Sequence, residues 1–297
     1  MNQCAILTMD NLDDFEVNDH LIEPHLNDLG WQATMVSWRD QSVNWNDYQA
    51  VIIRSPWDYQ DDADGFLHVL KQIESSSAHL ENSLAIVEWN IDKVYLQTLE
   101  KQQVQLVPTL WREHFDAEDL AGYFSYFKQK QIVIKPRISA NADNTFWLTV
   151  ENYQEKIAAL NEAFATRSFM VQPFMENIVA EGEYSLFYFN GQYSHAIIKT
   201  PKNNDFRVQE EHGGQLKAIE PEASLVEYAQ ATMAALAKIH QIPLYARVDF
   251  VRHQQGFALM EAELIEPSLY FNMDNKSAQR FAQAFAERIK NIEKKNA

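Results

Sequence analysis

The sequence predicts two kinds of architecture in one chain: an N-terminal α/β half built on a parallel sheet, and a second half of the α+β type. In the first hundred residues, short apolar runs alternate with segments of helical periodicity, which is typical of βαβ units. In the second half, paired apolar runs flank turn sequences, and such hairpins indicate antiparallel sheet. The chain has 297 residues, which corresponds to roughly two domains of about 150 residues each.

The N-terminal half begins with an apolar run at residues 5–9, which predicts a buried strand. Residues 15–29 carry apolar side chains at helical spacing and are followed by Gly30, a residue that often ends helices. Further short strands are expected at 31–38, 50–53 and 84–87, with a helix around 66–73 between the last two. This order predicts a small doubly wound α/β domain.

The second half is expected to contain more antiparallel pairs. Two apolar runs between residues 184 and 198 flank Asn190-Gly191, a pair typical of a type I′ hairpin turn. A second hairpin is expected from Tyr245 to Leu264. The other expected elements are helices at 116–129, 151–165, 222–240 and 276–293, and strands at 131–135, 146–150 and 169–174.

Composition excludes several classes of protein. Hydrophobic residues make up 46% of the chain, which is enough for a substantial core and argues against disorder. The net charge of −17 repels phosphate backbones and anionic lipid, so we expect neither nucleic acid nor membrane as a partner. Cys4 is the single cysteine, and the N-terminus lacks the cationic lead of a signal peptide. A cytoplasmic protein is therefore expected.

Common catalytic and nucleotide-binding motifs are absent from the sequence. It has no G-x-x-x-x-G-K-[ST], no G-x-G-x-x-G and no G-x-S-x-G. Its nine histidines never fall in H-x-x-x-H or H-E-x-x-H spacing, which argues against a zinc site. These negatives leave three patterns to explain.

The first pattern is a group of acidic side chains on the second hairpin. Asp249 lies on one strand, and Glu261 and Glu263 lie on the other, where alternation places both glutamates on one face. An edge strand with solvated charges is the ordinary explanation, but the flanking residues are apolar. Because converging carboxylates repel each other unless cations lie among them, we favour a site for Mg²⁺, which prefers oxygen ligands.

The second and third patterns are basic. Lys135 ends a strand and is followed by a loop of small polar residues, 139–145, which is able to fold over a polyphosphate. Lys93 near the start of a helix, Lys199 at the end of a hairpin strand, and Arg207 add further positive charge. Each of these is ordinary alone, since most basic side chains are solvated. Only their conjunction with the acidic hairpin distinguishes them from ordinary surface charges.

In this order and spacing, the residues from about 51 to 271 resemble the ATP-grasp superfamily. Asn90-Ile91-Asp92-Lys93 and Ile134-Lys135-Pro136 look like its two lysine motifs, and Glu181-Gly182-Glu183-Tyr184-Ser185 like its G-E-x-S segment. The resemblance implies an N-terminal domain (1–105), a central lid (106–173) and a C-terminal domain (174–297). It also implies an ATP site between the last two. The expected ATP-binding residues are Lys93, Lys135, Ser139, Asn141, Thr145, Gln172, Pro173, Phe174, Glu181 and Glu183.

Within that superfamily, the chain is similar to the branch that contains the D-cycloserine-forming cyclo-ligase and prokaryotic glutathione synthetase-like proteins. Arg54-Ser55-Pro56-Trp57-Asp58-Tyr59, Pro108-Thr109-Leu110-Trp111 and Glu266-Pro267-Ser268-Leu269-Tyr270 carry this similarity. Two features depart from the superfamily pattern. Glu263 stands where Asn is usual at the third metal position, and the phosphate loop has no glycine but contains Asp143.

The resemblance implies a reaction in which a substrate carboxylate attacks the γ-phosphate of ATP and an amine then displaces phosphate from the acyl phosphate. Asp249, Glu261 and Glu263 would bind two Mg²⁺ ions, with Mn²⁺ as an alternative. Arg207 would cover the developing charge, and Lys199 would hold the acyl group or a phosphate. Arg54 and Asp58, at the end of a parallel strand, and Ser268 are the expected substrate residues.

Several alternatives stay open from the sequence. An ATP-grasp kinase would stop at the phosphorylated product, and a non-catalytic nucleotide-binding protein would not turn over. The substrate is either a ureido-serine precursor that closes to a ring or a wider set of amino acids and dipeptides. The oligomeric state is open as well, with a homo-oligomer as one alternative, because the branch often forms dimers or tetramers. No general base is evident, although His212 is a candidate.

Overall fold

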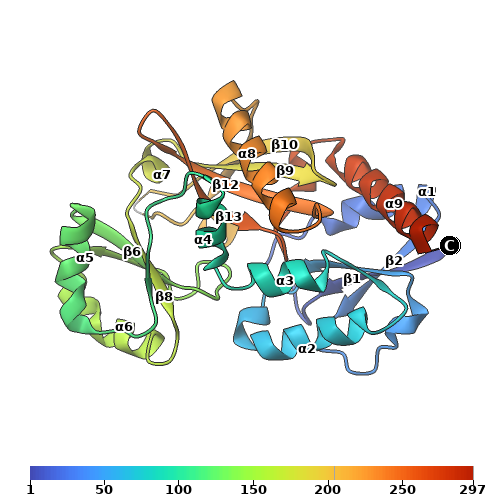
Figure 1. Cartoon of the computed structure of the whole chain (residues 1–297), viewed down its shortest axis with the longest axis horizontal. Coiled ribbons are helices and arrows are strands. Elements are labelled where there is room, and N and C mark those ends of the chain that lie inside the picture. The colour runs from blue at the N-terminus through green and yellow to red at the C-terminus, as the bar shows by residue number, and fades with distance from the viewer. Residues whose placement is uncertain (204, 297) are drawn as a thin grey trace.

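The protein is described here by a computed structural model that covers residues 1–203 and 205–296. Three sheets lie next to one another along its longest axis (Figure 1). None of the helices in the described part of the chain is long and apolar enough to cross a lipid bilayer.

The first sheet is fully parallel, as the alternating pattern predicted, with strand order β2-β1-β3-β4. Alternate residues of the central strand face opposite cores: Cys4 and Ile6 pack in one, and Ala5 and Leu7 in the other. Its strands are β1 (Asn2–Thr8), β2 (Trp31–Ser37), β3 (Ala50–Ser55) and β4 (His79–Glu81), with helices α1 (Glu23–Asp28), α2 (Ala63–Glu74) and α3 (Leu84–Asn90). The next helix, α4 (Tyr95–Lys101), packs instead in the core of the third sheet.

Two of the expected elements differ in this half. Residues 84–87, expected as a strand, form the start of α3, because a short apolar run fits a buried helix as well as a strand. The strand beside β3 is β4 instead. The helix expected at 15–29 is confined to a 3₁₀ turn and the short α1, which begins at Glu23 with Pro24 in its first turn.

The second sheet is antiparallel and has the order β5-β8-β6-β7. It carries α5 and α6 against one apolar cluster that includes Ile132, Leu148 and Phe169. Its elements are β5 (Leu110–Arg112), α5 (Leu120–Phe127), β6 (Gln131–Pro136), β7 (Phe146–Thr149), α6 (Ile157–Ala163) and β8 (Phe169–Pro173). In Figure 1 this green part lies at the end of the molecule away from the first sheet.

The third sheet is also antiparallel, with order β11-β10-β9-β12-β13, and occupies the middle of the molecule (Figure 1). Asn190 (φ 48°) and Gly191 (φ 77°) form the predicted tight turn between β9 and β10. The elements here are α7 (Asn177–Ala180), β9 (Glu183–Phe189), β10 (Gln192–Thr200), β11 (Gln215–Ala218), α8 (Ala223–Ile239), β12 (Tyr245–His253), β13 (Gly256–Glu263) and α9 (Ser277–Asn296).

The C-terminal helix α9 packs back onto the N-terminal part of the chain. Phe281 and Phe285 of α9 share one apolar cluster with Ile6 of β1 and Phe189 of β9. The rings of Trp31 and Phe285 meet edge to face with centroids 4.8 Å apart. The first and third sheets therefore share one continuous apolar core, so their positions relative to each other are fixed.

A buried histidine in the third sheet provides a stability test. His195 of β10 stacks on Phe187, and its Nε2 is 3.1 Å from the carbonyl oxygen of Leu269, so Nε2 is the donor. Burial lowers the pKa of His195 from 6.5 to about 4, against the smaller opposing effect of Asp274. The fold therefore favours the neutral ring, and its stabilising effect is complete above pH 6.5 and lost as the pH falls toward 4.

We therefore expect His195→Gln to remove part of the acid sensitivity. Between pH 7 and pH 4 the wild-type protein should lose about 3 kcal/mol more free energy of unfolding than the variant, since only the wild type must keep this ring neutral. Urea unfolding across that pH range measures the difference. If the free energy of unfolding falls by the same amount in both proteins between pH 7 and pH 4, His195 is not the group responsible.

Candidate active site

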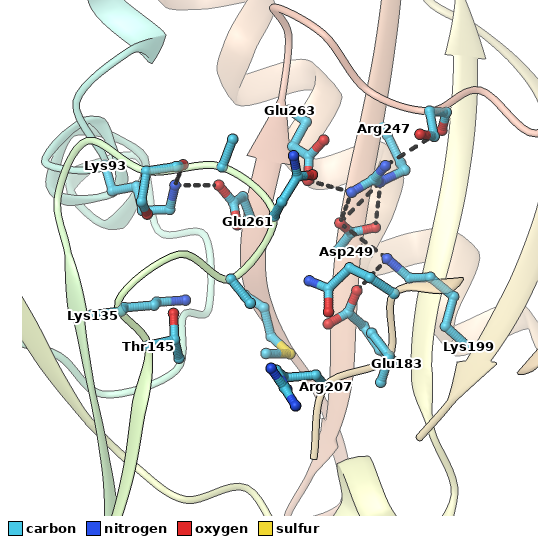
Figure 2. A pocket seen from close by; sticks show the side chains of 18 of the residues that line it. Lys93, Lys135, Thr145, Glu183, Lys199, Arg207, Arg247, Asp249, Glu261 and Glu263 are labelled. Carbon is cyan, nitrogen blue, oxygen red and sulfur yellow. Dashed lines mark hydrogen bonds and ion pairs between the residues drawn. The ribbon is translucent and has the colours of Figure 1, made fainter. Parts of the chain in front are cut away.

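A large pocket lies where residues from all three sheet regions meet, and Figure 2 shows its charged lining. Most of the residues that the sequence singled out line it. They are Lys93, Lys135, Ser139, Asn141, Thr145, Gln172, Pro173, Phe174, Glu183, Lys199, Arg207, Asp249, Glu261, Glu263 and Ser268. The fold thus gathers side chains that are separated by up to 175 positions in the chain.

The acidic hairpin forms one wall of the pocket. In the register of β12 and β13, Asp249 pairs with Glu261 and Arg247 pairs with Glu263. Because Arg247 and Asp249 are two residues apart on one strand, they share a face. Each carboxylate is met by a cationic side chain, as the dashed lines in Figure 2 show.

Arg247 is the most heavily paired of these cations. Its Nε lies 3.0 Å from Asp249 Oδ2, its Nη2 pairs with Glu263, and its Nη1 donates to the carbonyl oxygen of Ser268 at 3.3 Å. Although burial opposes the charge, Asp249 and Glu263 raise the pKa of Arg247 well above its usual range. Burial also opposes ionisation of Asp249, but Arg247 and Lys199 lower its pKa. Arg247 and Asp249 are therefore both charged at neutral pH before any ligand enters.

Lys199 and Glu183 extend this network on β9 and β10. Lys199 Nζ forms an ion pair with Glu183 and lies 3.6 Å from Asp249 Oδ2. Ser185 donates its hydroxyl to Asp249 Oδ1 at 2.5 Å. Although burial opposes the charge of Lys199 too, these carboxylates raise its pKa, so it stays an ammonium at neutral pH.

The backbone that positions Glu183 is close-packed. Gly182, just before it, has φ +127°, a conformation that L residues rarely adopt. A Cβ placed there would lie 2.8 Å from Ile198 Cγ1 and 2.8 Å from the carbonyl oxygen of Lys199. Glycine at this position lets β9 and β10 approach closely enough for Glu183 and Lys199 to pair.

The two lysines on the other side of the pocket differ in their partners. Lys93 Nζ lies 2.9 Å from Glu261 Oε1 and donates to the carbonyl oxygen of Ser139 at 2.8 Å. Lys135, by contrast, has no ion pair or hydrogen-bond acceptor for its ammonium among the residues that the structure describes. Burial lowers the pKa of Lys135, with Glu261 opposing this. In Figure 2 its side chain extends into the pocket beside Thr145.

The loop 139–145 adopts a tight conformation without glycine. Asn141, Ala142 and Asn144 have positive φ of 52°, 57° and 47°. Asparagine tolerates this region better than most residues, which accounts for the missing glycine at two of the three positions. Asp143 forms an ion pair with Arg167 at 3.3 Å and does not line the pocket, so its charge is not directed at the phosphate position.

Part of the pocket lining is apolar and aromatic. It includes Val133, Pro173, Phe174 and Met260. Trp147 stacks on Phe174 with ring centroids 4.6 Å apart, and Gln172 Nε2 donates to Thr109 Oγ1 at 2.9 Å. Aromatic and aliphatic side chains of this kind suit a purine base.

Arg207 lies at the pocket beside Phe206, in the segment between β10 and β11. Its guanidinium forms hydrogen bonds to Asp205, with Nη2 2.9 Å from Oδ2. The hydrogen bond from Arg207 lowers the pKa of Asp205 and raises that of Arg207. More than a third of the Arg207 side chain is exposed, so it is able to turn toward a bound ligand. His212 does not line the pocket.

Three of the expected site residues are not brought into the main pocket. Asp58 pairs with Arg39 at 2.7 Å, and Glu181 pairs with Arg252 at 2.7 Å. Arg54 is buried, with Nε 3.0 Å from Asp19 Oδ1, and borders a small adjoining hollow instead. These contacts meet their charges within the protein, so the structure does not support direct roles for Asp58 and Glu181 at the pocket.

Other lining residues were missed from the sequence. Arg247 had a usable signal, since it lies two positions before Asp249 on the same strand. Tyr59, Glu266 and Tyr270 had none beyond their place in the resemblance motifs. Their roles depend on segments that meet only in the folded chain.

A parallel N-terminal sheet, a small antiparallel sheet and an antiparallel sheet that carries acidic strands, with lysines across the pocket, together define an ATP-grasp protein. A solved D-alanine–D-alanine ligase from Bacillus anthracis shares the fold, with a TM-score of 0.71 at 13% identity over 100% of both chains. The solved D-cycloserine synthetase DcsG gives a TM-score of 0.86 at 26% identity, covering 97% of this chain and 100% of that one.

Comparisons with known sequences identify the family to which the chain belongs. The family profile described as the N-terminal domain of D-cycloserine synthetase DcsG matches residues 4–82. The cycloserine biosynthesis protein DcsG of Streptomyces lavendulae is 30% identical over 285 residues, which cover 88% of this chain and 90% of that protein. The chain belongs to the DcsG family, and it is an ATP-dependent ligase that forms C–N bonds.

Proposed function

We propose that this ligase activates the carboxylate of an amino-acid-like substrate as an acyl phosphate and then forms a C–N bond, with the amine in the same molecule when the product is a ring. The observation that carries the proposal is Lys135, a pocket cation without a protein partner among the described residues, opposite the acidic hairpin. Its ammonium lies in a partly buried position, where a nearby anion stabilises it, and a triphosphate supplies that anion.

The pocket has a cationic part and an apolar part, and together they support a binding position for ATP. Lys93, Lys135 and the loop 139–145 would hold the phosphates, and the apolar region around Phe174 would hold the base. We infer that residues 1–105, 106–173 and 174–297 act as three units, with the middle one closing over the nucleotide. A neighbour of the same fold, the ligase from Bacillus anthracis, was solved in a complex with ATP.

The carboxylates fit Mg²⁺. They offer oxygen ligands alone, from Asp249, Glu261 and Glu263 on paired strands. Within the described residues no three His, Cys, Asp or Glu side chains are grouped closely enough to hold an ion by themselves. This agrees with Mg²⁺, which is usually bound through one or two carboxylates together with substrate phosphates. The ATP-grasp ligase PsnB, a neighbour in fold, was solved with Mg and ADP.

The number of ions, and Mn²⁺ as a substitute, remain predictions from the resemblance. When bound, such ions would neutralise charge on the phosphates. Six carboxylates and five cationic side chains line the pocket, so its charges nearly cancel and a triphosphate needs added positive charge.

The protein's own part in the reaction follows from its fixed charges. The substrate carboxylate oxygen attacks the γ-phosphorus, the bond to the β-phosphate oxygen breaks, and ADP leaves. Arg207 and Lys135 would stabilise the charge on the transferring group. The amine nitrogen then attacks the acyl carbon, the bond from that carbon to the phosphate oxygen breaks, and the departing phosphate takes the proton that the nitrogen loses. Lys199 and Arg247, held rigid by Asp249, keep positive charge beside the acyl group.

Purified protein with ATP and Mg²⁺ should release ADP only when a suitable carboxylate is present. The panel should contain ureido-serine, D-alanine and other amino acids, singly and in pairs. Hydroxylamine in the assay should trap the acyl phosphate as a hydroxamate. The double variant Asp249→Asn/Glu261→Gln serves as the control.

Each outcome separates the alternatives. Hydroxamate that the double variant fails to make supports the acyl phosphate. ADP release with a stable phosphorylated product, and no consumption of amine, indicates a kinase. ATP binding without turnover across the panel contradicts the proposed substrate class.

A further inference from the structure

The segment that carries Glu266 is held by an unusual run of hydrogen bonds. Six consecutive backbone carbonyl oxygens, at residues 264–269, each accept a hydrogen bond from a side chain. The donors in order are Asn82 Nδ2 (2.7 Å), the Tyr245 hydroxyl (2.8 Å), Trp57 Nε1 (2.9 Å), Arg54 Nη2 (2.8 Å), Arg247 Nη1 (3.3 Å) and His195 Nε2 (3.1 Å).

These donors come from separate parts of the fold. Arg54 lies on β3 of the parallel sheet and Trp57 follows that strand, while His195 and Arg247 lie on β10 and β12. All six donor side chains are buried, so their bonds are shielded from competing water. The segment cannot shift without breaking several of these bonds together. It therefore presents the side chains of Glu266 and Ser268 to the pocket at set positions, as precise ligand recognition requires.

The carboxylate of Glu266 differs from its neighbours in the pocket. Glu183, Asp249, Glu261 and Glu263 each pair with a lysine or arginine, whereas Glu266 has no cationic partner among the described residues. The Tyr59 hydroxyl lies near it and lowers its pKa, and Trp57 also lines this part of the pocket. A carboxylate that lines a pocket beside aromatic side chains is suited to a small cation.

The electrostatics agree with this geometry. Burial raises the pKa of Glu266 to about 7, Tyr59 and Lys93 oppose the rise, and Glu261 adds to it. A positively charged group placed against Glu266 would offset the burial and the repulsion at once. A primary ammonium supplies that charge in a small volume.

We propose that Glu266 determines specificity by binding the ammonium group of the amino-acid-like substrate, so that this ligase rejects acids that lack it. The inference rests on the proposed function, since it assigns a recognition group for that substrate class. Neither Arg54 nor Asp58, which the sequence favoured for substrate recognition, lines the pocket.

The test compares ureido-serine with an analogue in which hydrogen replaces its α-amino group. ADP release gives kcat/KM for each, with ATP and Mg²⁺ saturating. We expect the wild type to prefer ureido-serine by about ten- to hundredfold, the range for a charge-assisted hydrogen bond. Glu266→Gln should lower that ratio to within about threefold of one, and Glu266→Asp should fall between.

Glu211→Gln is the matched control, because Glu211 also lines the pocket but is exposed at its mouth. It should keep the wild-type ratio. The inference is overturned if Glu266→Gln keeps the wild-type ratio of kcat/KM for the two substrates, which includes the case in which kcat/KM falls equally for both. Glu266 would then be a structural residue. If that variant does not fold, the ratio for Glu266→Asp decides in the same way.

The failure of the proposed function has a different signature. If the wild type releases no ADP with either compound, ureido-serine is not its substrate. Calorimetric binding of the two compounds, in the presence of AMPPNP and Mg²⁺, then decides the inference. Tighter binding of ureido-serine that Glu266→Gln abolishes supports it, and equal affinities or no binding overturn it.

Discussion

Lys135→Met is expected to weaken ATP binding and reduce ADP release without destabilising the protein. Lys135 brings a positive charge into the pocket, and no described side chain neutralises it. Removing it should raise the Kd for AMPPNP about ten- to hundredfold, since a charge-assisted hydrogen bond to phosphate is lost. Turnover should fall at least about hundredfold, because the same charge supports the transferring phosphate.

The stability of this variant distinguishes a binding role from a structural one. Methionine is close to lysine in length and avoids the cost of a desolvated ammonium, so the free energy of unfolding should stay equal or rise by about 1 kcal/mol. Lys130→Met, an exposed lysine just before β6, is the matched control and should change neither property. Calorimetry and urea unfolding measure the two effects. Full nucleotide affinity in Lys135→Met would remove this lysine from the site.

Asp249→Asn is expected to cost both stability and activity. The carboxylate of Asp249 is buried between Arg247, Lys199 and Ser185, at 3.0, 3.6 and 2.5 Å. The amide keeps the shape but leaves two buried cations with less negative charge. The free energy of unfolding should therefore fall by about 3 kcal/mol, the lower end for a broken buried ion pair.

The same substitution at an exposed ion pair is the control. Asp143 pairs with Arg167 at 3.3 Å, with about a third or more of each side chain exposed. Asp143→Asn should cost less than about 1 kcal/mol. Urea unfolding of both variants measures the contrast, and equal losses would mean that the buried network stabilises no more than a surface pair.

Local pattern was sufficient for the elements in which neighbouring residues set the outcome. Asn190-Gly191 predicted a tight turn because both residues accept positive φ, and the structure has it. Alternation along β13 placed Glu261 and Glu263 on one face, and both line the pocket. The run at 84–87 was mistaken for a strand because four apolar residues carry no period that separates strand from helix.

Long-range pairing lay beyond any local pattern. Lys93 and Lys135 have similar motifs, yet Lys93 meets Glu261 at 2.9 Å while Lys135 has no described partner. Arg54 appeared suited to a substrate, but Asp19, far away in sequence, meets its charge. The row of donors behind residues 264–269 is drawn from four regions of the chain.

The chain's own residues thus establish which chemical groups are available and on which face of a strand or turn they lie, because bond geometry acts over a few positions. Folding establishes which charges neutralise one another and which face the ligand, because side chains far apart in sequence compete for the same partners. Lys135 and Glu266 have the ordinary chemistry of lysine and glutamate. They matter because the fold pairs the neighbouring charged side chains with one another, while these two have no oppositely charged partner among the described residues.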